Sequence, residues 1–177
     1  MEKHLICISG KAEAGKTTLA NYLDKKLDSL ILNNGDHVKD IATRHYRWDG
    51  KKDEAGRSLL QWLGTDICRK NNPNIWVNVI KEDIKGLISE YDYFIIADCR
   101  FENEIEVLKQ SFDNVITVRI NRSKHISELT EKQLLHPSET SLDNFDFDYK
   151  VDAENIKDLE NYGDKIIYDL ERKIHHA

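Results

Sequence analysis

A glycine-bounded loop near the start of the chain restricts its fold more than any other feature. Gly10 and Gly15 enclose four residues, and Lys16 and Thr17 follow at once. An apolar run at 5–8 precedes the loop and a helical leucine pattern follows it, which is the order of a phosphate-binding loop. Such a loop turns backbone N–H groups toward phosphates, with the lysine on the outer phosphates and the hydroxyl on Mg²⁺. An ordinary turn has no use for these two side chains, so we predict binding of a nucleoside triphosphate.

Length, charge and cysteine content narrow the class of protein. A chain of 177 residues suits one domain spanning 1–177, and the net charge of -6 argues against a general nucleic-acid or membrane-surface binder. The three cysteines lack metal-ligand spacing, which suits a reducing compartment. There is no signal-peptide layout and no apolar run near the ~18 residues of a membrane span. We therefore expect a soluble cytoplasmic protein without nucleic-acid or membrane partners.

Strand-like runs alternate with helical patterns along the chain. The strand-like runs are 5–8, 29–33, 93–98, 115–120 and 147–152. This alternation, with a phosphate loop after the first strand, predicts an α/β fold of the P-loop NTPase type. We expect a doubly wound, mainly parallel sheet of about five strands with helices on both faces.

Polar residues follow two of the expected strands, at the sheet edge where open α/β folds bind ligands. Residues 34–36 indicate a turn and helix cap after the second strand, which places Asp36 and Lys39 at this edge. Asp98 ends the continuous apolar run 93–98. An acid there, beside a phosphate loop, is positioned to hold Mg²⁺ directly or through water, although capping of the next helix would also explain it.

The segment 57–70 has helical spacing and a second periodic feature. Four polar residues recur at intervals of four and share one stripe: Arg57, Gln61, Thr65 and Arg69. A solvated face would more typically carry Glu and Lys pairs. Trp76, in the next helix, is by default a packing residue. The polar segment 46–56 indicates a loop, for which a plain solvated connector explains the composition equally well.

A long polar stretch at 126–145 follows the strand that bears Arg119 and Arg122. Such an insertion after a strand tip suggests a mobile lid, and a surface helix with its loop is the alternative. Several arginines could converge on this edge: Arg57, Arg69, Arg100, Arg119 and Arg122. Phosphoryl transfer between two anionic substrates needs such neutralising groups.

Four segments together resemble the deoxynucleoside monophosphate kinases of bacteriophage type. They are GKAEAGKT, RSLLQWLGTDICR followed by NPNIW, IADCRFENE, and HPSE. The resemblance spans about 5–152, and the pairing of RxLLQxLGTDxxR with DxRFxNE is specific. Glu13 departs from it, since related loops often carry a small or basic residue there. The resemblance implies transfer of the γ-phosphoryl group of ATP to a deoxynucleoside monophosphate, giving the diphosphate and ADP.

The same resemblance implies roles for individual residues. ATP phosphates would be bound by Gly10, Lys11, Ala12, Glu13, Ala14, Gly15, Lys16, Thr17 and Thr18, and Mg²⁺ by Thr17 and Asp98. The monophosphate would be surrounded by Asp36, Lys39, Arg57, Gln61, Thr65, Arg69, Trp76 and Glu139. Lys16, Arg100, Arg119 and Arg122 would act in catalysis. Helices within about 34–90 would form the monophosphate side, and about 122–145 the lid.

Two other functions stay open on the sequence alone. A kinase of the phosphomevalonate type shares a phosphate loop and a DxR strand end. A nucleotide-dependent switch should carry Asn-Lys-x-Asp and an Asp-x-x-Gly, but Asp98 is followed by Cys-Arg-Phe. The sequence does not rank the bases, and it leaves a homodimer open.

Overall fold

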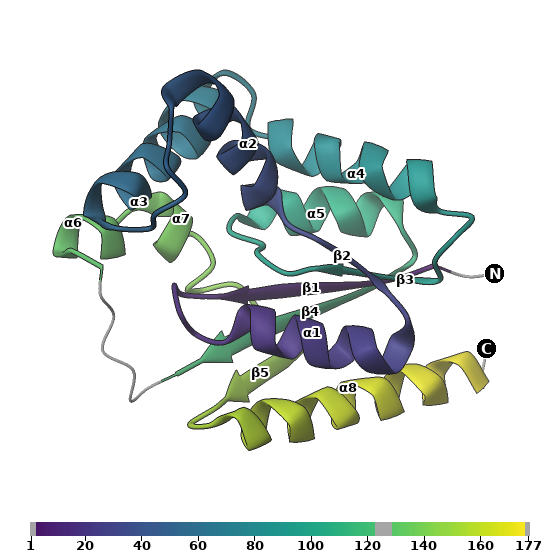
Figure 1. Cartoon of the computed structure of the whole chain (residues 1–177). Helices are drawn as coiled ribbons and strands as arrows, with labels where there is room; N and C mark the ends of the chain where they lie inside the picture. Colours follow the sequence, from purple (N-terminus) through teal and green to yellow (C-terminus); the bar gives the residue numbers. More distant parts are fainter. Residues whose placement is uncertain (1–2, 123–128, 176–177) are drawn as a thin grey trace.

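A five-stranded parallel sheet forms the centre of the computed structural model, which describes residues 3–122 and 129–175 (Figure 1). The strands are β1 (His4–Gly10), β2 (Leu30–Leu32), β3 (Tyr93–Ile96), β4 (Asn114–Asn121) and β5 (Tyr149–Asp152). Their order is β2-β3-β1-β4-β5, and every neighbouring pair is parallel. The predicted fold class is therefore confirmed.

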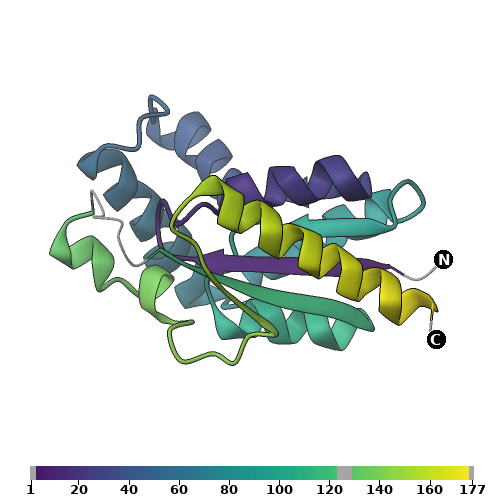
Figure 2. The same cartoon turned by 90° about the horizontal axis from the view of Figure 1, so that it is seen from below.

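Helices cover both faces of this sheet (Figure 2). The strand side chains alternate between the faces. Ile6 and Ile8 of β1 pack in one core with α1 (Lys16–Leu27) and α8 (Ile156–His175). Leu5 and Cys7 face the other core, with α4 (Ile75–Leu87) and α5 (Glu102–Ser111). Because β1 is buried on both faces, its residues 5–8 are continuously apolar and do not alternate with polar ones.

The remaining helices gather beyond the carboxyl ends of the strands (Figure 1). They are α2 (Asn34–Tyr46), α3 (Glu54–Gln61), the π-helix η1 (Trp62–Arg69), α6 (Glu131–Leu134) and α7 (Pro137–Thr140). Among the described residues, no helix combines the length and the apolar character needed to cross a membrane. These helices thus lie at the sheet edge where open α/β folds bind ligands.

Three local predictions need correction. Residues 34–36, predicted as a turn, form the first turn of α2, because Asp98 accepts the N–H groups of Asn34 and Gly35. The predicted helix 57–70 is α-helical only to Gln61 and continues as the π-helix. The loop predicted at 46–56 spans only 47–53, since the Asp53 carboxylate caps α3 by accepting from the Gly56 N–H at 2.8 Å. Residues 123–128, which belong to the predicted lid at about 122–145, lie outside the described residues.

The packing of α8 against the sheet generates a stability prediction. Ile166 is 0% exposed, whereas Ile156 in the same helix is 63% exposed. Ile166→Ala should lower the free energy of unfolding by about 2–5 kcal/mol, because it removes buried methyl groups and leaves a cavity. Ile156→Ala, the matched control, should change it by less than about 0.5 kcal/mol. Urea unfolding measures both, and equal losses would mean that α8 is not packed as described.

Candidate active site

The loop between β1 and α1 closes around the ammonium group of Lys16. Gly15, the residue before α1, has φ 101°, which L side chains rarely adopt. A Cβ there would also lie 2.9 Å from Leu159 Cδ1, so the leucine side chain would have to shift. The Nζ atom of Lys16 donates to the carbonyls of Gly10 at 2.8 Å and Lys11 at 2.7 Å. The lysine therefore spans the loop from the helix back to its start.

The surroundings of Lys16 lower the pKa of its ammonium group. Burial lowers the pKa of its ammonium to about 7, and the positive charge of Arg100 acts in the same direction. An anion bound in the loop would favour the charged form and raise this pKa again. The loop is therefore suited to receive negative charge.

A cavity of about 710 Å³ opens beside this loop, and most of the predicted site residues line it. Those that line it are Ala12, Glu13, Ala14, Gly15, Lys16, Thr17, Thr18, Lys39, Arg57, Gln61, Thr65, Arg69, Trp76, Asp98, Arg100, Arg122 and Glu139. Those that do not are Gly10, Lys11, Asp36 and Arg119. The structure thus brings together segments from 12 to 139 around one space.

The residues outside the cavity wall have other contacts. Arg119 is buried, and it donates to Ser9 Oγ at 3.0 Å and to Asp143 at 2.6 Å. Lys11 contacts the same aspartate at 3.1 Å. These contacts tie β1, β4 and the segment after α7 together. Asp36 is exposed and pairs with Lys39 at 2.6 Å.

The stripe of polar residues at intervals of four faces the cavity along its whole length. In an α-helix of about 3.6 residues per turn, each step of four overshoots one turn. In a π-helix, whose bonds run from i to i+5, the same step falls short of one turn. The change from α3 to η1 after Gln61 therefore cancels most of the drift. As a result Arg57 and Arg69, three steps apart, both line the cavity.

Arg69 is held by the segment after β3. Its guanidinium stacks on Phe101, with Cζ 3.6 Å from the ring centroid, and donates to Glu104 at 3.0 Å and Asn103 at 2.6 Å. Glu104 also accepts from the backbone N–H of Arg100 at 2.8 Å. Burial raises the pKa of Glu104 to about 7, although Arg69 and this N–H favour its charged form. The sequence RFENE thus orients one arginine of the cavity and anchors another.

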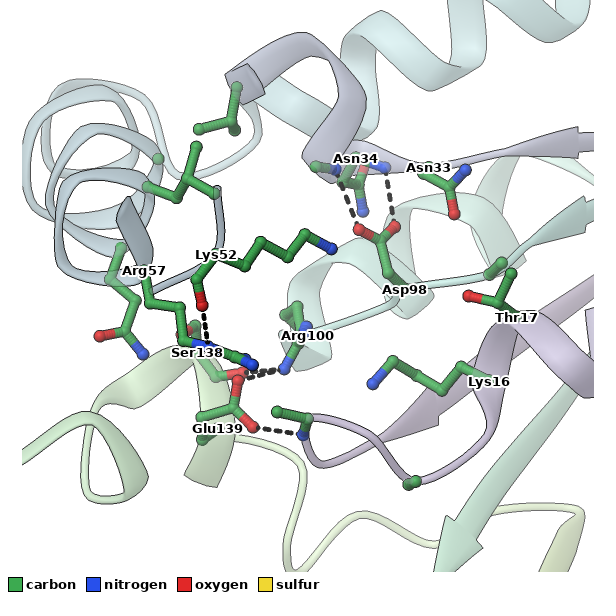
Figure 3. Close-up of a pocket in the computed structure, with 18 of the residues that line it drawn as sticks. Lys16, Thr17, Asn33, Asn34, Lys52, Arg57, Asp98, Arg100, Ser138 and Glu139 are labelled. Carbon is green, nitrogen blue, oxygen red and sulfur yellow. Dashed lines mark hydrogen bonds and ion pairs between the residues drawn. The ribbon is translucent and has the colours of Figure 1, made fainter. Parts of the chain in front are cut away.

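Asp98 links β3 to α2 across the cavity. Its carboxylate accepts from the N–H groups of Asn34 at 2.8 Å and Gly35 at 3.0 Å (Figure 3). Burial raises its pKa, while Arg100 lowers it. Thr17 Oγ1 and this carboxylate supply hard oxygen atoms to the same cavity, and a Mg²⁺ ion prefers such oxygen ligands together with water and phosphates. The donor set therefore fits the metal predicted from the sequence.

Two arginines of the cavity form ion pairs with glutamates. Arg57 pairs with Glu13 at 2.6 Å. Arg100 pairs with Glu139 at 2.5 Å (Figure 3). Glu139 also accepts from the N–H of Ala12 in the phosphate loop at 2.9 Å. Glu13, unusual at its position, has φ 64°, a left-handed conformation that costs energy in a non-glycine residue. Its ion pair with Arg57 explains why a carboxylate stands in this loop.

The segment after β4 rests on α3. Gln133 is 3% exposed, and its amide donates to the Glu54 carbonyl at 3.0 Å and to Ser58 Oγ at 3.1 Å. Gln61 donates to the Gln133 carbonyl at 3.3 Å. The predicted lid therefore contacts the predicted monophosphate side directly in this structure.

Sequence reasoning missed several residues that line the cavity. They are Asn33, Asn34, Gly35, Val38, Lys52, Leu60, Gly64, Ala97, Phe101, Glu104, Leu129 and Ser138. The helical spacing of Leu60 and Gly64 with their predicted neighbours was a usable signal. Lys52 had no such signal, because it belongs to an aperiodic polar loop.

Solved structures of small-molecule kinases share this fold. A sugar kinase from Janibacter sp. HTCC2649 is 15% identical with a TM-score of 0.54, over 90% of this chain and 91% of that chain. Shikimate kinase from Acinetobacter baumannii is 15% identical with a TM-score of 0.52, over 97% and 94%. The APS kinase CysC of Mycobacterium tuberculosis is 10% identical with a TM-score of 0.53, over 96% and 98%. At these identities the likeness concerns the fold alone.

Sequence comparison identifies the family. A search of curated proteins finds no match. The family model for deoxynucleotide monophosphate kinase matches residues 36–148, more than half of the chain. This range begins after the phosphate loop, so the match is independent of the loop at residues 10–17. The chain therefore belongs to the deoxynucleotide monophosphate kinase family, a family of phosphotransferases.

Proposed function

We propose that this protein transfers the γ-phosphoryl group of ATP, as its Mg²⁺ complex, to the phosphate of a deoxynucleoside monophosphate. One observation carries the proposal: the cavity has basic groups at two ends, and Lys16 and Arg57 face it from different sides (Figure 3). Lys16 and the loop amides form one end, and the stripe with Arg57 and Arg69 forms the other. Two phosphate-bearing substrates placed at these ends would meet within a single cavity. Family membership supports the nucleotide as the acceptor.

The position of each residue in the cavity suggests its role in the reaction. The loop residues 12–18 would bind the ATP phosphates, and Arg57 and Arg69 would grip the acceptor phosphate. Bound Mg²⁺, held by Thr17 Oγ1 and by Asp98 through water, would neutralise charge on the phosphates. Arg100, between the two ends, would contact the transferring group once Glu139 releases it. The reaction needs positioning and neutralisation of charge more than covalent help from the protein.

The lid and the homodimer stay predictions. The contacts of Gln133 with α3 support a role for 129–145 in closing the cavity, since they already join this segment to the acceptor end. A closed lid would keep water from taking the phosphoryl group.

The direct test is a panel of the four deoxynucleoside monophosphates and their ribose counterparts, with ATP and Mg²⁺, assayed by ADP release. We expect acceptor-dependent ADP release and a deoxynucleoside diphosphate product. ADP release with phosphomevalonate and with none of the nucleotides would overturn the proposal.

Lys16→Ala tests the phosphate loop. Turnover should fall about 100-fold or more, because a positive group on the transferring phosphate is lost. At about pH 8, ATP binding by the parent should take up a proton, since a lysine with a pKa about 7 is mostly neutral there and phosphates favour its charged form. For the same reason ATP affinity should fall as the pH rises above 7. Calorimetry in buffers of different ionisation enthalpy measures the uptake, which the variant should lose.

Lys25→Ala is the control for this variant, because Lys25 is exposed in the last turn of the same helix. It should keep both turnover and proton uptake. A Lys16→Ala enzyme within a few-fold of the parent would exclude a phosphate-loop function.

Asp98→Asn tests the metal and the anchor of α2 separately. The Mg²⁺ concentration for half-maximal rate should rise several-fold, because the amide loses the charge that favours the ion. Hydrogen exchange in α2 should quicken, because one acceptor for its N-terminal amides is lost. Asp92→Asn, at a partly buried ion pair with Lys3 before the start of β3, should change neither. Faster exchange with an unchanged Mg²⁺ requirement would assign Asp98 to anchoring alone.

Arg57→Lys and Arg69→Lys test the acceptor end. Each keeps the charge but loses the two-pronged geometry, so the acceptor KM should rise about tenfold while the ATP KM changes less than about twofold. Arg44→Lys, at an exposed pair with Asp40 on α2, is the control and should be silent. A larger rise in the ATP KM than in the acceptor KM would mean that the stripe binds ATP and not the acceptor.

A further inference from the structure

Lys52, in the loop 47–53 between α2 and α3, extends its side chain into the cavity. Lys52 is part of the cavity wall, and its side chain runs from the loop toward Asp98 (Figure 3). It approaches from the side of α3, whereas Lys16 approaches from the phosphate loop on the other side. The polar composition of this loop gave no indication of such a role.

The backbone at Lys52 is fixed by contacts that a solvated connector would not need. Arg57 Nε donates to the Lys52 carbonyl at 2.7 Å, and Trp48 Nε1 donates to the Lys51 carbonyl at 2.9 Å. Gly56 allows the loop to lie against α3, because a Cβ there would stand 2.1 Å from the Lys51 carbonyl oxygen. The loop is therefore built to hold this position.

Lys52 lies near three cations that each have a carboxylate partner. Lys39, Arg57 and Arg100 pair with Asp36, Glu13 and Glu139, respectively. The ammonium of Lys52 has no hydrogen-bond or ion-pair partner in residues 3–122 and 129–175. Burial lowers the pKa of Lys52, and the positive charges of Lys39, Arg57 and Arg100 lower it further. Asp36 and the solvent around this exposed side chain offset part of the repulsion, and an anion bound beside the ammonium would offset the rest.

We propose that Lys52 binds the phosphate of the acceptor nucleotide and stays in contact with it as the phosphoryl group arrives. This inference rests on the proposed function and adds a residue to the acceptor end. Its position on the α3 side favours the acceptor over ATP, whose loop lies across the cavity. A lysine suits the task, because a compact charge on a flexible stem can follow a phosphate oxygen, whereas the fork of Arg57 is fixed by Glu13 and the loop carbonyl.

The test compares Lys52→Gln with Lys51→Gln. Lys51 is the adjacent lysine, its side chain is exposed and pairs with Asp49, and only its backbone serves the loop. Calorimetry measures the binding of a deoxynucleoside monophosphate and, separately, of a non-hydrolysable ATP analogue. Lys52→Gln should weaken monophosphate binding about 10- to 100-fold, the range for a lost hydrogen bond to a charged group, with ATP-analogue affinity within about twofold. Lys51→Gln should change neither.

A second measurement separates this inference from the identity of the acceptor. With the phosphate loop saturated by ADP, inorganic phosphate should raise the melting temperature of the parent and of Lys51→Gln, but not of Lys52→Gln. This result would support Lys52 as a phosphate ligand even if the nucleotide panel failed. Equal shifts in all three proteins, or a loss of ATP-analogue affinity as large as that of the monophosphate, would overturn the inference. Lys52→Arg should recover part of the lost affinity, because it restores the charge.

Discussion

The arrangement of the site depends on the carboxylate of Asp98 and the two N–H groups at the start of α2. This contact joins the tip of a central strand to the first helix of the acceptor side. The free N–H groups of a helix N-terminus attract negative charge, so a carboxylate at this point also favours the orientation of α2. Since α2 packs with η1 and α4 in one apolar cluster, the contact indirectly sets the distance between the phosphate loop and the arginine stripe.

The buried charges around α5 form a second support. Arg69, Glu104 and Asn103 satisfy one another while Phe101 covers the guanidinium. Breaking a buried pair leaves an uncompensated charge, so such a cluster resists substitution of any single member. The cluster also places Arg69 in the cavity wall without exposing its whole side chain to solvent. The same side chains therefore stabilise the fold and line the cavity.

Much of the fold was predictable because its signals are local. The apolar strands and the phosphate loop follow one another in an order that few folds permit, and this order predicted the parallel sheet. The stripe from Arg57 to Arg69 was predictable from its spacing, but the π-helix that keeps it aligned was not, because spacing alone does not distinguish the two helix types. Arg119 was harder to predict. Its place in β4 suggested that its side chain would line the cavity, but it contacts Ser9 and Asp143 instead. Lys52 depends on contacts between Gly56, Trp48 and the loop, which no periodic pattern records.

The pairing of two cavity arginines with glutamates has a consequence for phosphate binding. A phosphate that enters this cavity replaces a carboxylate instead of neutralising a bare cation, so binding is an exchange of one anion for another. The gain is then the difference between the two anions, which favours a doubly charged phosphate over singly charged competitors. When no phosphate is bound, the ion pairs with Glu13 and Glu139 weaken the positive electrostatic potential of Arg57 and Arg100 outside the cavity. A chain with a net charge of -6 can in this way carry a dense cluster of cations without presenting an open basic surface to unrelated polyanions.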